Sequence, residues 1–175
     1  MAEIVMNPTK SLPALFLLMY TLFMGAGCAQ PQAIVDGKVD VEIAGETFSC
    51  EIVADNDSRT VGLGNHPGLG RNEAMLFSFP DSRVRSFLMR DCTFDIDIIF
   101  LDPTGRITAM HEMSVEEARR EDESQFQYEM RLAKYSSRFN AQYAIEFAGG
   151  TLDRLELDMG DQIELNTEAL QSITE

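Results

Sequence analysis

Alternating apolar and polar positions predict a series of short β-strands along most of this chain. Residues 39–43 and 48–52 alternate strictly, and Ala44-Gly45-Glu46 between them is typical of a hairpin turn. Further apolar-rich segments, separated by turn residues, continue the pattern, and Pro80-Asp81-Ser82 is expected to end one of them. They predict strands at 74–79, 84–89, 94–101, 106–113, 143–147 and 161–165.

Helix signals are fewer than strand signals. Asp55 to Ser58 supply N-cap chemistry for a short helix over 59–63, and Thr151 predicts another short turn of helix. Ser114-Val-Glu-Glu117 reads as a capping box, which predicts one substantial helix running towards Lys134. Its apolar stripe is expected to rest on the sheet and consists of Phe126, Met130 and Ala133.

Together these elements predict an α+β fold that is rich in β-structure. We expect a mainly antiparallel, small, barrel-like sheet of about seven short strands, with one substantial helix and one or two short ones. The 175 residues have room for one such domain, at 39–166, plus a targeting segment. Residues 167–175 are expected to form a polar tail.

The N-terminus has the pattern of an export signal. Lys10 precedes an apolar run at 11–24, which is short for a membrane-spanning helix, and small residues at 25–27 then lead to Cys28. This order resembles a bacterial lipobox. It predicts a signal peptide at 1–27, a lipidated Cys28, and a linker at 28–38. A plain secreted protein, an uncleaved anchor and a cytoplasmic protein are the alternatives.

Charge and cysteine content narrow the classes of partner. The net charge of −15 disfavours binding to nucleic acid or to anionic head groups, although Arg83, Arg85 and Arg90 form a local basic cluster. After export, Cys50 and Cys92 either form a disulfide or remain as thiols, Cys50 then being a small buried apolar residue. No CxxC motif or Cys/His cluster indicates a zinc site, and we expect no cofactor.

An ordered set of motifs makes the chain recognisable from about residue 39 to 166. The motifs are Val61-Gly-Leu63, Ala74-Met-Leu-Phe77, Phe87-Leu-Met-Arg90 and Asp97-Ile-Ile-Phe100, then Tyr143, Glu146 and Gly149 in one strand, and Gly160-Asp161. With them the chain resembles the bacterial and archaeal family called domain of unknown function number 192. The resemblance implies a small, often exported, β-rich domain, and it implies no established substrate or catalytic residue.

The chain departs from the family pattern at its most polar motif. Asp91-Cys92 stands where the pattern has Asn-Thr, and Leu88 replaces its Trp. Asp95 replaces a Pro, and Gly64 replaces the Met of Gly-Leu-Met. A function that relatives perform with that motif is therefore expected to be altered or lost here.

Carboxylates close to this motif are the candidate chemical groups. Asp91, Asp95 and Asp97 fall within seven residues, and Glu146 lies on another predicted strand. Crowded carboxylates suit acid–base catalysis or a hard cation such as Ca²⁺. In the structural alternative, Asp97 caps backbone N–H groups of a neighbouring turn or pairs with Arg90. The candidate binding residues are Arg90, Asp91, Asp97 and Glu146.

Three functional hypotheses follow from these features. The first is a lipid-anchored envelope module, without catalysis, that binds a small ligand or a protein. The second is an envelope hydrolase or metal-assisted enzyme that uses the carboxylates and an arginine. The third is a structural or assembly factor. A pocket where the carboxylates converge with Arg90 would favour the second hypothesis.

Overall fold

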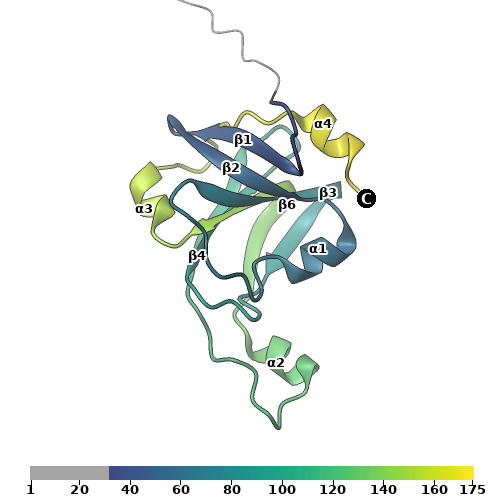
Figure 1. Cartoon of the computed structure of the whole chain (residues 1–175), viewed down its shortest axis with the longest axis vertical. Coiled ribbons are helices and arrows are strands. Elements are labelled where there is room, and N and C mark those ends of the chain that lie inside the picture. The colour runs from purple at the N-terminus through teal and green to yellow at the C-terminus, as the bar shows by residue number, and fades with distance from the viewer. Residues whose placement is uncertain (1–31) are drawn as a thin grey trace, which may run out of the picture. The chain divides into compact units, whose positions relative to one another are not determined.

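The computed structural model describes residues 32–175, and six of its segments form one open β-sheet (Figure 1). The strand order is β1-β2-β3-β6-β4-β5, and every neighbouring pair is antiparallel except β2 and β3. The strands are β1 (Lys38–Ile43), β2 (Glu46–Val53), β3 (Glu73–Phe87), β4 (Ile96–Leu101), β5 (Ile107–Met113) and β6 (Tyr135–Ala148). The α+β class and the mainly antiparallel sheet are confirmed. The leader and Cys28 lie outside the described residues.

Two parts of the strand prediction are wrong: the barrel-like closure and the number of strands. The sheet has two open ends, β1 and β5, and six strands within residues 32–175. Segment 74–79 and most of segment 84–89 belong to one strand, β3, which accommodates Pro80 in a bulge and ends at Phe87. Proline lacks an N–H donor, and a bulge is one of the places where a strand tolerates it. Segment 161–165 contributes only an isolated bridge between Gln162 and Arg106.

Both faces of the central strands are buried, because their alternate side chains enter two separate apolar clusters. On β4, Ile99 and Leu101 join the cluster that also holds the side chains of β1 and β2, while Ile98 and Phe100 join the opposite one. All six residues of β4 are buried, as expected for a strand covered on both faces. The second cluster, around Phe77 and Phe100, underlies the site described below.

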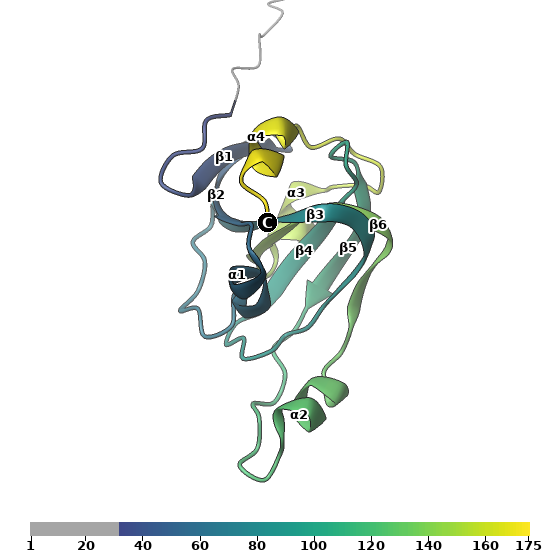
Figure 2. The ribbon, with the colours of Figure 1, turned by 90° about the vertical axis from the view of Figure 1, so that its right-hand side faces the viewer.

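The substantial helix predicted from Ser114 is much shorter in the structure. The helix is α2 (Gln125–Arg131), and its capping box uses Ser124 and Gln127 rather than Ser114. The highly charged segment before it has no apolar stripe to bury, so it runs as a loop. Figures 1 and 2 show α2 set apart from the sheet. The side chains of Phe126 and Met130 are 73% and 57% exposed, so their predicted packing on the sheet is wrong.

The other helices are short and pack close to the ends of strands. They are α1 (Asn56–Val61), α3 (Thr151–Leu155) and α4 (Thr167–Ser172). Helix α1 has Asp55, the first of the predicted N-cap residues, as its N-cap, so it begins earlier than the predicted 59–63. Helix α4 lies in the expected polar tail (Figure 2). Its residue Leu170 is buried and anchors the helix to the domain. No helix within residues 32–175 is long and apolar enough to cross a membrane.

Candidate functional site

A cavity of about 510 Å³ opens between α1, β3 and the loop that follows β3. Four arginines line it, together with three phenylalanines of β3 and two further side chains that can ionise. The arginines are Arg59, Arg83, Arg85 and Arg90; the phenylalanines are Phe77, Phe79 and Phe87; and the other ionisable groups are Cys92 and Glu146. We call this cavity the arginine pocket. Its positive charge contrasts with the net charge of −15 for the whole chain.

The bulge in β3 gives the arginine pocket its rim. Ser78 pairs with Tyr143 and Arg83 pairs with Ala141, so residues 79–82 lie opposite the single residue Gln142 of β6. Such an insertion bends the strand and redirects its side chains. The bulge is hydrogen-bonded rather than loose, because the Phe79 carbonyl accepts from the amides of Gln142 and of Gln171 on α4.

Arg85 is the most buried of the four arginines, with 8% of its side chain exposed. Its guanidinium contacts the Asp81 carboxylate at 2.5 Å, donates to the Asp81 carbonyl, and lies 4.0 Å from the centre of the Phe79 ring. Burial lowers the pKa of Arg85, and the hydrogen bond to Asp81 partly offsets this shift. Arg85 therefore contributes a fixed charge to the wall of the pocket.

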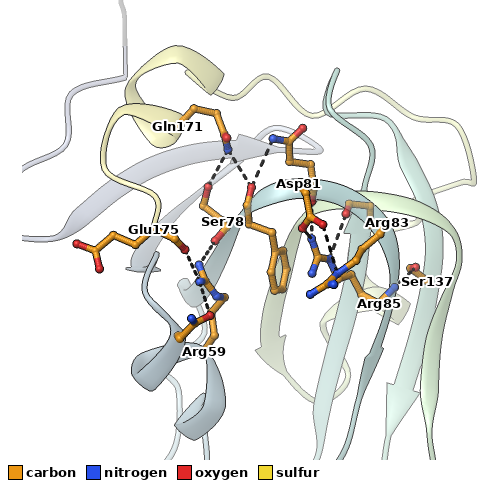
Figure 3. Close-up of polar contacts among 12 residues, drawn as sticks. Arg59, Ser78, Asp81, Arg83, Arg85, Ser137, Gln171 and Glu175 are labelled. Atoms are coloured by element: carbon orange, nitrogen blue, oxygen red, sulfur yellow. Dashed lines mark hydrogen bonds and ion pairs between the residues drawn. The ribbon is translucent and has the colours of Figure 1, made fainter.

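Arg59 connects α1, β3 and the C-terminus (Figure 3). It donates to the carbonyls of Ala54 and Ser78, both at 2.8 Å, and to the carbonyl of Glu175. Its guanidinium also lies 5.5 Å from the Phe79 ring centre. Because its N–H groups serve these carbonyls, Arg59 holds the pocket together and supplies positive charge beside it.

The remaining two arginines have fewer protein partners. The side chain of Arg83 is 68% exposed, and its ionic partner, Asp81, is 3.6 Å away. Arg90 contacts Glu129 of α2 at 2.9 Å and also donates to the Thr60 carbonyl. A guanidinium has five N–H donors, so both side chains retain donors for a ligand.

Glu146 is the buried acid of the arginine pocket. It lies on β6 between Met75 of β3 and Ile98 of β4, and it is 5% exposed. Its Oε2 is buried without a hydrogen-bond partner, the one such side-chain atom among residues 32–175. Burial raises the pKa of Glu146 to about 8, so the carboxyl is mostly protonated at neutral pH.

Cys92 borders the same part of the cavity. Burial, together with the smaller effect of the nearby Glu146 and Asp91 carboxyls, raises the pKa of its thiol to about 12. Cys92 and Cys50 are both free thiols, and Cys50 is fully buried on β2. A thiol with so high a pKa is a poor nucleophile near neutral pH.

The four candidate residues from the sequence do not come together. Arg90 and Glu146 line the arginine pocket, whereas Asp97 faces another hollow and Asp91 lines neither. The side chain of Asp91 is exposed, while its backbone N–H donates to the Tyr128 hydroxyl. The predicted carboxylate cluster is therefore not formed.

Asp97 has the structural role considered as the alternative. Its Oδ2 accepts a hydrogen bond of 2.8 Å from the N–H of Leu152 in the first turn of α3. Burial raises the pKa of Asp97, and hydrogen bonds from this turn oppose the shift. Asp95, Glu112 and Asp153 border the same hollow. Across residues 32–175, no three His, Cys, Asp or Glu side chains gather in a geometry that would hold a metal ion.

Several lining residues were not identified from the sequence as part of a site. Arg83 and Arg85 had stood out as a basic cluster, which was the available signal. No sequence signal pointed to Arg59 or Phe79, because α1 and the β3 bulge come together only in the folded domain. Of the four candidate residues from the sequence, only Arg90 and Glu146 line this pocket in the structure.

Comparisons with known proteins agree with this fold. A crystal structure of a candidate transcription regulator from Sinorhizobium meliloti 1021 is similar, with 25% identity, a TM-score of 0.57, and coverage of 73% of this chain and 91% of that one. A protein of unknown function from Novosphingobium aromaticivorans DSM 12444 is also similar, with 22% identity, a TM-score of 0.59, and coverage of 78% and 94%. The search of curated proteins gives no significant match. The profile of the family DUF192, described as "Uncharacterized ACR", matches residues 39–165, and the chain therefore belongs to the DUF192 family.

Proposed function

We propose that the domain is a non-catalytic binding module that takes up a small organic anion in the arginine pocket. The observation that carries this proposal is that four arginines line one cavity of an acidic protein. Cationic groups in a concave site concentrate an anion and orient its carboxylate or phosphate oxygens.

The four arginines have different roles in anion binding. Arg59 and Arg85 are held by backbone carbonyls and by Asp81, so they supply a fixed positive field. Arg83 is mostly exposed at the rim and has a single distant ionic partner, so it is free to turn its donors towards a ligand. Arg90 supplies further donors from the loop after β3.

The rest of the pocket suits an apolar or aromatic body attached to the anionic group. Phe77, Phe79 and Phe87 line the cavity, and their rings contact one another, with centroids 5.0 to 6.5 Å apart. Small-molecule sites are commonly cavities of about 300–1,000 Å³ with apolar walls and a few polar groups. A carboxylate or phosphate carried on a ring or a short chain fits this description.

Location and anchoring are part of the same proposal. The lipobox-like segment supports export, with the domain tethered through Cys28 to a membrane facing the periplasm or the cell exterior. A tethered module of this kind would bind its ligand in the envelope. We propose no nucleic-acid partner, because the net charge of −15 opposes one.

A protein-binding role is the second candidate, and the observation that favours it is the exposed apolar side of α2. Phe126 and Met130 project from a helix set apart from the sheet. Replacing both with serine should abolish recruitment of an envelope partner and leave the arginine pocket unchanged. The carboxylate-based hydrolase has less support, because Glu146 is the one carboxylate that lines the pocket among residues 32–175.

The test is a thermal-shift comparison of anionic probes with matched neutral and cationic ones. Benzoate and phenylphosphate should raise the melting temperature, whereas benzyl alcohol and benzylamine should not. A ligand at 100 times its Kd adds about 2.7 kcal/mol to the free energy of unfolding, which gives a readily measured shift.

Two arginine variants locate the binding site. Arg83→Gln should weaken the response to the anions, while Arg71→Gln is the control, because its side chain is similarly exposed at 69% and lies outside the pocket. Anions that stabilise both variants equally would overturn the proposal, and so would neutral and cationic probes that stabilise the protein as strongly as benzoate.

A further inference from the structure

Glu146 is placed where a ligand would reach it. It lines the arginine pocket and is only 5% exposed. Its Oε2 has no hydrogen-bond partner in the described part of the chain. Its cross-strand neighbours, Met75 and Ile98, are apolar, and their side chains provide no hydrogen-bond donor. A buried polar group without a partner is unusual in native proteins and calls for an explanation.

The charged groups of the pocket do not provide that partner. Arg59 comes from α1, Arg83 and Arg85 come from β3, and Arg90 comes from the loop after β3. Burial alone accounts for the raised pKa of Glu146, and none of these arginines opposes it. Cys92 is the remaining titratable group of the lining, and its thiol stays protonated because its own pKa is about 12. The arginines at the rim of the pocket therefore do not stabilise a negative charge on Glu146.

We propose that protonated Glu146 donates a hydrogen bond to an acceptor at the inner end of the ligand whose anionic end the arginines bind. This inference rests on the proposed function and narrows its ligand class. The ligand is an organic anion with two polar ends, separated by an apolar body that contacts the phenylalanines. Its inner end carries an uncharged acceptor, such as a ketone or amide oxygen, rather than an ammonium group.

The inference makes ligand affinity depend on pH. When only the protonated form of a site binds, the apparent affinity falls in proportion to the protonated fraction. For a group with a pKa of about 8, that fraction is nearly complete at pH 6 and about one tenth at pH 9. Affinity for a ligand with an inner acceptor should therefore fall about tenfold between pH 6 and pH 9.

Three probes of matched size test the proposal on the purified protein by calorimetric titration. They are 4-acetylbenzoate, 4-isopropylbenzoate and 4-(1-aminoethyl)benzoate, which share a ring and a carboxylate that stays ionised from pH 6 to pH 9. At pH 6, 4-acetylbenzoate should bind about tenfold more tightly than the isopropyl compound, because one hydrogen bond distinguishes them. Only the acetyl compound should weaken at pH 9.

Two substitutions identify the group responsible. Glu146→Gln retains a donor in its amide, so it should keep the preference for the acetyl compound and lose the pH dependence. Glu146→Leu removes the donor, so the acetyl and isopropyl compounds should bind equally.

The other outcomes distinguish a failure of the Glu146 hydrogen bond from a failure of the anion site. Equal binding of the acetyl and isopropyl compounds to the unmodified protein at pH 6 would overturn the inference and leave the anion site intact. Tightest binding of the amine, with loss in Glu146→Gln, would also overturn it, because Glu146 would then act as an anion. If no probe binds, the proposed function fails as well.

Discussion

The raised pKa of Glu146 predicts an unusual pH dependence of stability, which the substitution Glu146→Gln should remove. The pKa of this carboxyl rises from 4.5 to about 8 on folding, because burial disfavours its charged form. The folded protein therefore binds this proton more tightly than the unfolded chain does. The resulting stabilisation is complete below about pH 4.5 and is lost as the pH rises towards 8.

The magnitude follows from the size of the shift. Each pH unit between the two pKa values changes the free energy of unfolding by about 1.4 kcal/mol. From pH 4.5 to pH 8 the contribution of Glu146 thus falls by about 5 kcal/mol, which is a large part of the stability of an ordinary domain. Glutamine stays neutral, so Glu146→Gln should match the unmodified protein near pH 5 and exceed its stability at pH 9.

The measurement is urea unfolding at pH values from 5 to 9. The chain has no tryptophan, so far-ultraviolet circular dichroism is the suitable signal. Carboxylates with lowered pKa values, such as Asp55 and Asp81, affect both proteins equally and cancel in the difference. Glu51→Gln is the matched control, because Glu51 lies in the same row across the sheet, beside Met75, and is exposed.

Two outcomes of this measurement would contradict a raised pKa of Glu146. If the two stability curves run parallel from pH 5 to pH 9, Glu146 has the same pKa in the folded and unfolded chains. If the unmodified protein instead gains stability over Glu146→Gln as the pH rises, the carboxylate is charged and partnered in the folded state. Either result would remove the basis for the pH-dependent binding proposed above.

Four further substitutions test separate parts of the structure. Arg59→Ala should lower the free energy of unfolding by about 2–3 kcal/mol in urea, because it removes charged hydrogen bonds to backbone carbonyls, whereas Arg71→Ala should change it by less than about 1 kcal/mol. Asp97→Ala should cost about 1–3 kcal/mol by thermal denaturation, and an unchanged melting temperature would contradict its capping role. Leu170→Ala should cost about 3 kcal/mol if α4 is anchored as the structure shows, which urea unfolding would measure. Cys28→Ala should move the protein from the membrane fraction to the soluble one, and persistent lipidation of this variant would contradict the proposed anchor.

Local patterns were sufficient to predict most strands. Strict alternation identified β1 and β2, and apolar-rich segments separated by turn residues identified β4 and β5, because these features depend on neighbouring residues alone. The bulge in β3 could not be read from Pro80, since a proline between two apolar segments ordinarily marks a break. Its tolerance depends on β6, which lies far away in the sequence.

The helix between β5 and β6 shows how two similar local signals compete. Ser114 and Ser124 each begin a capping-box pattern, and only the second is followed by residues that form a helix. Between Ser114 and Ser124, charged side chains instead make hydrogen bonds that hold a loop, such as the one that Glu116 accepts from the Ala133 N–H. Sequence spacing alone does not show which of these interactions prevails.

The site was predictable only in part, for a similar reason. Glu146 and Arg90 belonged to motifs and were identified, whereas Arg59 enters the pocket because the C-terminal residues and β3 hold it there. Asp97 was grouped with Glu146 by residue type. On the folded sheet Asp97 lies opposite Phe147, so it and Glu146 project from opposite faces.

The central claim is that the arginine pocket binds an organic anion, and a nuclear magnetic resonance titration with 4-acetylbenzoate tests it most directly. We expect saturable shifts of the amide signals of Gly62, Gly64 and Ser86, which line this pocket, and small shifts at Gly149 and Gly150, which line the other hollow. We also expect that Arg83→Gln weakens the response. Saturable shifts confined to Gly149 and Gly150, or none at all at millimolar probe, would contradict the claim.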